Sequence, residues 1–275
     1  MKKILFPTDF SDVSQNAFIY ALKLAEVLNA EIITLHVYAV DSPQFIDISA
    51  YLQKIYGRKE LRDFENYKDE IPVLRSIAEA NNLSHVPIKN VLIQGNLIAE
   101  ILKFSKNEQI DIIVTGTKGI TQLRQIFFGT TTTKIMDEAQ TSVLAIPGKC
   151  QFQPIDKILF TTRYHIDDIE ILKKVNDLAK LLNAHVDCLN IKPAHKAYND
   201  DFIVDFKNVF KDQNVAFHSV ISDDVEGAIL NFIQQNQIKM IAVHTRHKGF
   251  FEKLFQVSLS KKLAIDINIP LLSVK

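Results

Sequence analysis

The sequence has no net charge of either sign, because its 32 basic residues balance 32 acidic ones. Proteins that bind nucleic acid usually carry a basic domain or stripe, so the composition removes the main argument for that class of partner. No run of lysine and arginine is long enough to predict binding to an anionic membrane surface. A neutral chain with 47% hydrophobic residues is typical of a globular protein with a well-filled core.

Long apolar runs are missing as well. No window approaches the roughly 18 apolar residues of a membrane helix. At the N-terminus only residues 4–6 are apolar before Pro7, whereas the core of a signal peptide needs at least about seven apolar residues. The sequence therefore predicts a cytoplasmic protein that neither crosses nor binds a membrane.

Cysteine is scarce. Cys150 and Cys188 lie far apart and form no CxxC pair. This spacing excludes a disulfide framework and a zinc site built on cysteine pairs. Both residues are predicted to be small apolar side chains of the core.

The sequence does contain a regular alternation of short apolar runs and helical patterns. The first such run, KILF at residues 3–6, stops at Pro7, and apolar side chains then recur at helical spacing through residues 11–30. Residues 1–149 are predicted to form four helices and five strands, the strands covering residues 3–6, 31–37, 86–95, 110–116 and 141–147. Apolar runs without alternation indicate strands covered on both faces, as in an open parallel sheet between helices.

The same pattern then begins again. KILF recurs at residues 157–160, an offset of 154, and residues 101–114 align without a gap on residues 229–242, an offset of 128. The difference between the offsets predicts an insertion in the first copy, around residues 40–59, whose role the sequence does not define. We predict two related domains, residues 1–149 and 150–275, and the short join between them favours their packing together.

Glycine is also scarce, yet three of the eight glycines fall in GTKGITQLRQIFFGT, residues 116–130. This stretch leaves an apolar strand and ends where a helix opens, and ligands of open parallel sheets bind at such strand ends. A helix N-terminus suits a phosphate, and glycines at 116, 119 and 129 would let the backbone approach it closely. Thr130 would add a hydroxyl and Lys118 a cation.

Other interpretations of these residues stay open. The glycines are also explained by turn chemistry, Asp9 by helix capping or as a surface loop carboxylate, Lys118 as a solvated lysine and residues 130–133 as a helix start. Two nucleotide motifs are excluded by spacing. No lysine follows the last glycine, as a Walker A loop requires, and the first strand is followed by PTDFSD instead of GxGxxG.

Gly116-x2-Gly119-x9-Gly129-Thr130 resembles the ATP-binding signature of the universal stress protein family. The opening KILFPTDFSDVSQNAFIYALKLA, the segment LHVYAV and the closing TSVLAIPGK are also similar to that family. The resemblance covers essentially the whole chain as a tandem protein. It implies two open five-stranded parallel sheets of order 3-2-1-4-5 flanked by helices, the adenine-nucleotide alpha hydrolase-like fold.

The resemblance also implies a stress-response function with ATP, accompanied by Mg²⁺, as the ligand. Adenosine would be held by Pro7, Thr8, Asp9 and Val37, with Asp9 near the base or ribose and Val37 acting through its backbone. The phosphate side of the site would be formed by Thr115, Gly116, Lys118, Gly119, Gly129, Thr130 and Thr131.

The second copy departs from this pattern. At the aligned positions His244, His247 and Val257 replace the three glycines, Arg163 replaces Asp9, and Ser258 keeps the hydroxyl. We predict that it does not bind ATP and that it packs on the first copy through their last strands, as an intrachain pseudo-dimer. The same pairing would allow a homodimer of chains.

His244 and His247 raise three further interpretations. Two histidines without a carboxylate or cysteine nearby are weak support for a metal, so a drifted loop is favoured. Binding of a different anion by Arg163 and the two histidines is the alternative.

Three functions follow from the sequence. The first is a regulatory protein that binds ATP in residues 1–149. The second is a slow ATPase, although no base or arginine finger is evident, so at most weak hydrolysis is expected. The third is a scaffold that binds no ligand. Binding separates the third function from the others, and turnover separates the first two.

Overall fold

The structure of the chain is a computed structural model that describes residues 1–38, 67–117, 130–192, 194, 201–245 and 268–275. The first half contains β1 (Lys2–Pro7), α1 (Asp12–Leu28), β2 (Ala30–Tyr38), a helix over 67–80, β3 (Ile88–Gln94), α3 (Leu97–Asn107), β4 (Ile112–Thr117), α4 (Thr130–Glu138) and β5 (Ser142–Pro147). The second half contains β6 (Lys157–Thr161), α5 (Asp168–Leu182), β7 (His185–Lys192), α6 (Asp201–Val209), β8 (Val215–Ile221), α7 (Val225–Asn236), β9 (Met240–His244) and β10 (Leu271–Val274).

The first strand and helix form as their sequence predicts. Residues 4–7 of β1 are buried, and the ring of Phe6 packs on that of Phe18 from α1 at a centroid distance of 5.1 Å. Ser11 caps α1 by accepting a hydrogen bond from the backbone N–H of Ser14. The helix ends at Asn29, whose left-handed backbone (φ 50°) closes the last turn.

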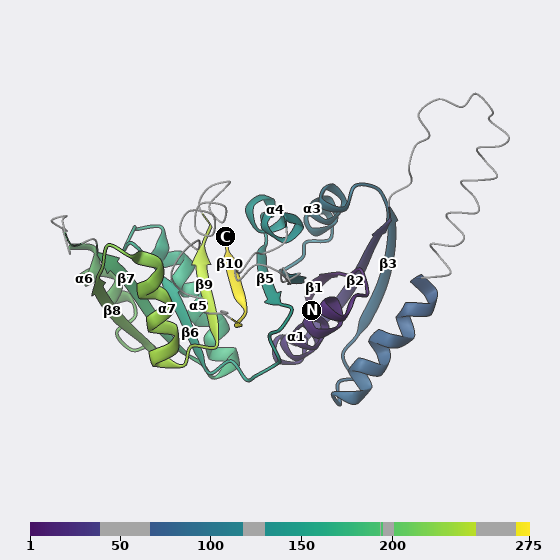
Figure 1. Cartoon of the computed structure of the whole chain (residues 1–275), viewed down its shortest axis with the longest axis horizontal. Helices are drawn as coiled ribbons and strands as arrows, with labels where there is room; N and C mark the ends of the chain where they lie inside the picture. The colour runs from purple at the N-terminus through teal and green to yellow at the C-terminus, as the bar shows by residue number, and fades with distance from the viewer. Residues whose placement is uncertain (39–66, 118–129, 193, 195–200, 246–267) are drawn as a thin grey trace, which may run out of the picture. The chain divides into compact units, whose positions relative to one another are not determined.

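The chain divides into two compact units, Met1–Thr115 and Gly116–Lys275. Figure 1 labels the helices and strands. The first unit holds β3-β2-β1-β4 in spatial order, paired in parallel. The second holds β5-β10-β9-β6-β7-β8. Within it, the run β8-β7-β6-β9-β10 is the order 3-2-1-4-5 predicted for the second copy. The predicted α/β class with helices on a mostly parallel sheet is confirmed.

Strand β5 pairs with β10, and this pair is antiparallel. Leu144 lies opposite Leu272, and Ala145 lies opposite Leu271. Because β5 is bonded to the last strand of the chain, it groups with the second compact unit. The domain boundary predicted from the repeat, between residues 149 and 150, stays a prediction.

The two halves repeat the same long-range contacts. The ammonium of Lys3 donates to the carbonyl of Glu108 at 3.0 Å, and that of Lys157 donates to the carbonyl of Asn236 at 3.1 Å. These pairs are 105 and 79 residues apart in sequence, a difference of 26 that equals the difference between the two repeat offsets. The extra length of the first half lies between β2 and β3. The predicted insertion, around residues 40–59, lies outside the described residues.

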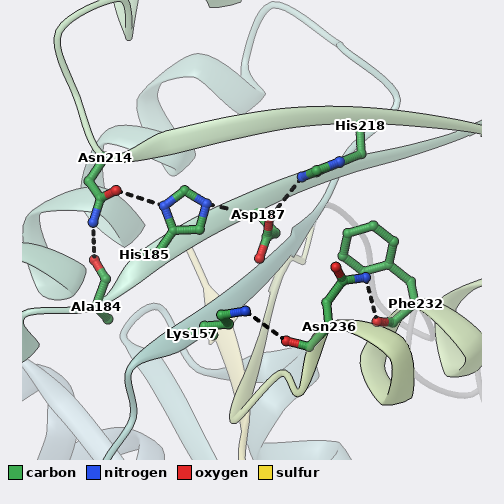
Figure 2. A network of polar contacts seen from close by, with 8 residues as sticks. All are labelled: Lys157, Ala184, His185, Asp187, Asn214, His218, Phe232 and Asn236. Atoms are coloured by element: carbon green, nitrogen blue, oxygen red, sulfur yellow. Dashed lines mark hydrogen bonds and ion pairs between the residues drawn. The ribbon is translucent and has the colours of Figure 1, made fainter.

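The helices of the second half cover both faces of its strands. On one face, the ring of His218 from β8 contacts Phe232 of α7 and its Nε2 contacts Asp187 of β7 (Figure 2). On the other face, the carboxylate of Asp168, at the start of α5, raises the pKa of the thiol of the neighbouring Cys188 of β7. Because successive strand side chains point to opposite faces, α7 and α5 lie on opposite sides.

Some features are not found among the described residues. None of the described helices is long and apolar enough to cross a membrane. No set of three or more histidine, cysteine or acidic side chains in the described ranges is arranged to hold a metal ion. Cys150 and Cys188 are both free thiols buried in the core, as their spacing predicted.

The cap of α3 gives a modest test of this local structure. Asn96 accepts a hydrogen bond from the backbone N–H of Ala99 at 3.2 Å. We expect Asn96→Ala to lower the free energy of unfolding by about 1 kcal/mol, because one N–H of the first turn loses its partner. Asn107→Ala, at the exposed end of the same helix, is the matched control in urea unfolding. Equal effects of the two variants would contradict the capping role.

Candidate functional site

The loop after β1 is fixed by hydrogen bonds on both sides. Pro7 and Thr8 are buried, and the Thr8 N–H donates to the carbonyl of Leu35 on β2 at 3.0 Å. The Thr8 hydroxyl pairs with that of Ser14 on α1 at 2.8 Å. The carboxyl end of β1 is thereby tied to β2 and to the first turn of α1. Val37, predicted to act through its backbone, is half-buried near the carboxyl end of β2.

Asp9 is exposed at this strand end, and its carboxylate orientation is set by its neighbour. Oδ1 of Asp9 accepts from the Ser11 hydroxyl at 2.6 Å and from the Ser11 N–H at 3.2 Å. The residue that caps α1 is Ser11, so the capping interpretation of Asp9 is wrong. Its binding to a ribose stays a prediction.

Three aromatic rings from separate segments meet beside this loop. Phe10, in a left-handed backbone conformation (φ 59°), lies 5.3 Å from the ring of His36 and 5.9 Å from that of Tyr67. Nδ1 of His36 lies 2.8 Å from the carbonyl of Thr8. Burial raises the pKa of the Tyr67 hydroxyl. No local sequence pattern indicates this cluster, because its three rings come from distant segments of the chain.

The predicted phosphate side begins where β4 ends and α4 starts. Thr115 is buried, and the carbonyl of Gly116 accepts a hydrogen bond from the Thr132 hydroxyl at 3.3 Å. Thr130, the first residue of α4, is exposed, and Thr131 is half-buried. The end of β4 and the first turn of α4 are therefore adjacent, as a phosphate-binding loop between them requires. Lys118, Gly119 and Gly129 lie outside the described residues.

The second half rebuilds the corresponding loop with different side chains. The Thr162 N–H donates to the carbonyl of Leu189 at 3.0 Å, and Tyr164 has the same left-handed backbone (φ 55°) as Phe10. Ser14 is replaced by Asp168, a carboxylate that is 2% exposed and accepts from the Thr162 hydroxyl at 2.7 Å. The loop conformation is kept, and a buried charge has been added.

His244 also contacts this carboxylate. Its Nδ1 lies 2.8 Å from Oδ1 of Asp168, and its side chain is 15% exposed. The drifted-loop interpretation of His244 is therefore wrong, because the residue ends β9 and pairs with a buried acid that lies 76 positions away in sequence. Arg163 is exposed in the neighbouring loop. His247, Val257 and Ser258 lie outside the described residues.

The negative charge of Asp168 also affects Cys188 on β7. Burial raises the pKa of the Cys188 thiol well above its usual value, and the Asp168 carboxylate raises it further. Cys188 is therefore an unreactive thiol packed against α5, because the reactive form of cysteine is the thiolate.

The comparisons with known proteins agree with this architecture. The sequence profile described as "Universal stress protein family" matches residues 1–147, more than half of the chain. The chain belongs to the universal stress protein family. Over 158 residues it is 28% identical to universal stress protein MJ0577 of Methanocaldococcus jannaschii, a match covering 54% of this chain and 96% of that protein. Universal stress protein MJ0531 of the same organism is 30% identical over 145 residues, covering 53% of this chain and 81% of the relative.

A solved structure extends the likeness in fold to both halves. A universal stress protein from Archaeoglobus fulgidus superposes on 99% of this chain and 98% of its own, with a TM-score of 0.72. The two sequences are 18% identical, so the match concerns the fold alone. The universal stress protein fold is thus found along the whole length of this chain.

Proposed function

We propose that this universal stress protein is an ATP-binding regulatory protein of the stress response, with the nucleotide held by residues 1–149. The observation that carries the proposal is the position of the glycine signature. It starts at the end of β4 and finishes directly before α4, and Thr132 joins these two elements through the carbonyl of Gly116. An anion between them would meet backbone N–H groups at the positive end of a helix.

The described residues fit the chemistry of a nucleotide. Asp9 presents an exposed carboxylate, an acceptor for ribose hydroxyls, beside the buried Thr8. Thr130 would offer a hydroxyl to the phosphates, and Lys118, which lies outside the described residues, would add a cation. Mg²⁺ bound with the nucleotide would neutralise phosphate charge.

The second half is proposed to be structural. His244 stands where the first half has Gly116, and its imidazole is held by Asp168. Arg163 in place of Asp9 removes the acceptor for ribose hydroxyls. The antiparallel pair of β5 and β10 supports association of the two repeats through their last strands, and a homodimer would use a similar contact.

The experiment that tests the proposal is nucleotide analysis of protein purified without added ligand, followed by calorimetric titration with ATP and Mg²⁺. One nucleotide per chain is the expected result. Two per chain would show that the second half also binds, and none would favour the ligand-free scaffold. Turnover measured in the same samples is expected to be slow, and fast hydrolysis would favour the ATPase instead.

Asp9→Arg tests the adenosine side of the site. We expect this variant to bind ATP at least about tenfold more weakly, because it removes the ribose acceptor and introduces the side chain of the second repeat. Asp12→Arg is the matched control, since Asp12 is an exposed acid in the first turn of α1. Calorimetry should separate the two variants, and unchanged affinity in Asp9→Arg would place the site elsewhere.

A further inference from the structure

The loop that carries Asp9 is held by hydrogen bonds on both sides of this residue. The carbonyl of Thr8 lies 2.8 Å from Nδ1 of His36. Because a carbonyl only accepts, this ring nitrogen carries the proton and donates. On the other side, the Phe10 N–H donates to the Thr8 hydroxyl at 3.0 Å, and the Phe10 carbonyl accepts from Nε2 of Gln15 at 3.1 Å. The backbone position of Asp9 therefore depends on its two neighbours.

Phe10 has a backbone conformation that a bulky residue rarely adopts. Its φ of 59° lies in the left-handed region, where a side chain is held only by its surroundings. Its ring contacts that of His36 on β2 and that of Tyr67 in the helix over 67–80. The rings of His36 and Tyr67 are themselves stacked, with centroids 6.1 Å apart and an interplanar angle of 24°. The three rings of Phe10, His36 and Tyr67 are called the aromatic clamp below.

The second half builds the same loop without an imidazole. By strand register Asn190 stands at the position of His36, and its Nδ2 donates to the carbonyl of Thr162 at 2.8 Å. An amide therefore suffices for this hydrogen bond, which belongs to the fold of both repeats. What the imidazole of His36 adds is a ring in contact with Phe10.

An aromatic residue on this loop is also common to both repeats. Tyr164, with a φ of 55°, lies 5.2 Å from the ring of Phe206 on α6. The imidazole is therefore the part of the aromatic clamp that distinguishes the first half. It accompanies the second difference between the two loops, in which Asp9 of the first half is replaced by Arg163.

We propose that the aromatic clamp positions Asp9, holding its carboxylate where it accepts hydrogen bonds from the ribose hydroxyls of ATP. This inference rests on the nucleotide site proposed above. Asp9 is exposed, so its place is set by the chain on either side of it and by Ser11, whose hydroxyl donates to its Oδ1. A loop that is ordered before the nucleotide arrives loses less conformational freedom on binding.

Titrations with two nucleotides test the aromatic clamp. ATP and 2′,3′-dideoxyATP, each with Mg²⁺, differ only in the two ribose hydroxyls. We expect the wild type to bind ATP about tenfold more tightly, as for a hydrogen bond to a charged group. In Phe10→Ala this preference is expected to fall below about threefold, because Asp9 is no longer held in place. A change that only lowered stability would weaken the binding of both nucleotides alike and leave the preference unchanged.

His36→Asn is the second variant, and it decides the test if Phe10→Ala does not fold. It copies Asn190, so it keeps a donor for the Thr8 carbonyl and removes only the ring. We expect its preference for ATP to fall about threefold.

Two controls accompany these variants. Phe10→Tyr keeps a ring on the loop, as Tyr164 does in the second half, and should retain the wild-type preference. Phe104→Ala is the matched control, because it removes a half-buried ring of α3, and it should retain the preference as well.

The outcomes separate this inference from the proposed function. A wild-type preference that survives in either folded variant, Phe10→Ala or His36→Asn, would overturn the positioning role and leave the nucleotide site intact. Equal binding of the two nucleotides by the wild type would show that Asp9 does not meet the ribose, which also overturns the inference. Binding of neither nucleotide would overturn the proposed function as well.

Discussion

The variant Gly129→Val is expected to bind ATP at least about 100-fold more weakly than the wild type. In the sequence Gly129 directly precedes Thr130, the first residue of α4, and the proposed phosphate site is at the N-terminus of this helix. A β-branched side chain at this position would occupy space that the phosphate needs. The second repeat carries this same change, since Val257 aligns with Gly129.

Calorimetric titration with ATP and Mg²⁺ measures the effect, and circular dichroism verifies that the variant remains folded. The reverse change in the second repeat, Val257→Gly, is the matched control and should leave the affinity of the first repeat unaltered. Wild-type affinity in Gly129→Val would mean that the glycines serve only as turn residues.

Asp168→Ala is expected to lower the free energy of unfolding of the second half by about 3 kcal/mol. The carboxylate is buried and accepts from the Thr162 hydroxyl and from Nδ1 of His244, so its removal leaves both donors without this partner. These contacts join the loop after β6 to α5 and β9 at one point. The effect should therefore exceed that of any surface charge on α5.

Urea unfolding followed by circular dichroism gives the measurement. Asp177→Ala is the matched control, because Asp177 is an exposed acid on the same helix and should change stability by less than about 0.5 kcal/mol. The double variant Asp168→Ala/His244→Ala completes a cycle, in which we expect a coupling of at least about 1 kcal/mol. Additive single effects would show that the two side chains do not interact.

Much of the fold could be predicted from the sequence, because it depends on local patterns. The KILF runs at residues 3–6 and 157–160 lie in β1 and β6. The two repeat offsets match the positions of equivalent contacts, in which Lys3 and Lys157 each donate to a backbone carbonyl. Ser11, a favourable capping residue directly before the helical pattern, is the N-cap of α1. These features follow from periodicity, turn residues and spacing within a short window.

The polar clusters could not be predicted, because each joins residues that are distant in sequence. Asp168 is the first residue of α5, and in the sequence alone it indicates only an acid that stabilises the first turn of a helix. Its pairing with His244 requires knowing that β9 lies beside β6. Asp187 is likewise a single acid within an apolar strand, and its histidine partner on β8 is 31 residues away. Only the assembled sheet shows that these groups meet.

The pairing of β5 with β10 has a consequence for synthesis of the chain. About 120 residues separate the two strands, so β5 leaves the ribosome long before its partner. At roughly 5–20 residues per second, the delay is on the order of 6–24 s. During that time the edge of β5 that later binds Leu271 and Leu272 has no intrachain partner, and an unpaired edge can pair with another chain. The β5 strands of two nascent chains on neighbouring ribosomes can therefore pair with each other. The risk of misassembly is greatest before β10, the last strand of four residues, has been synthesised.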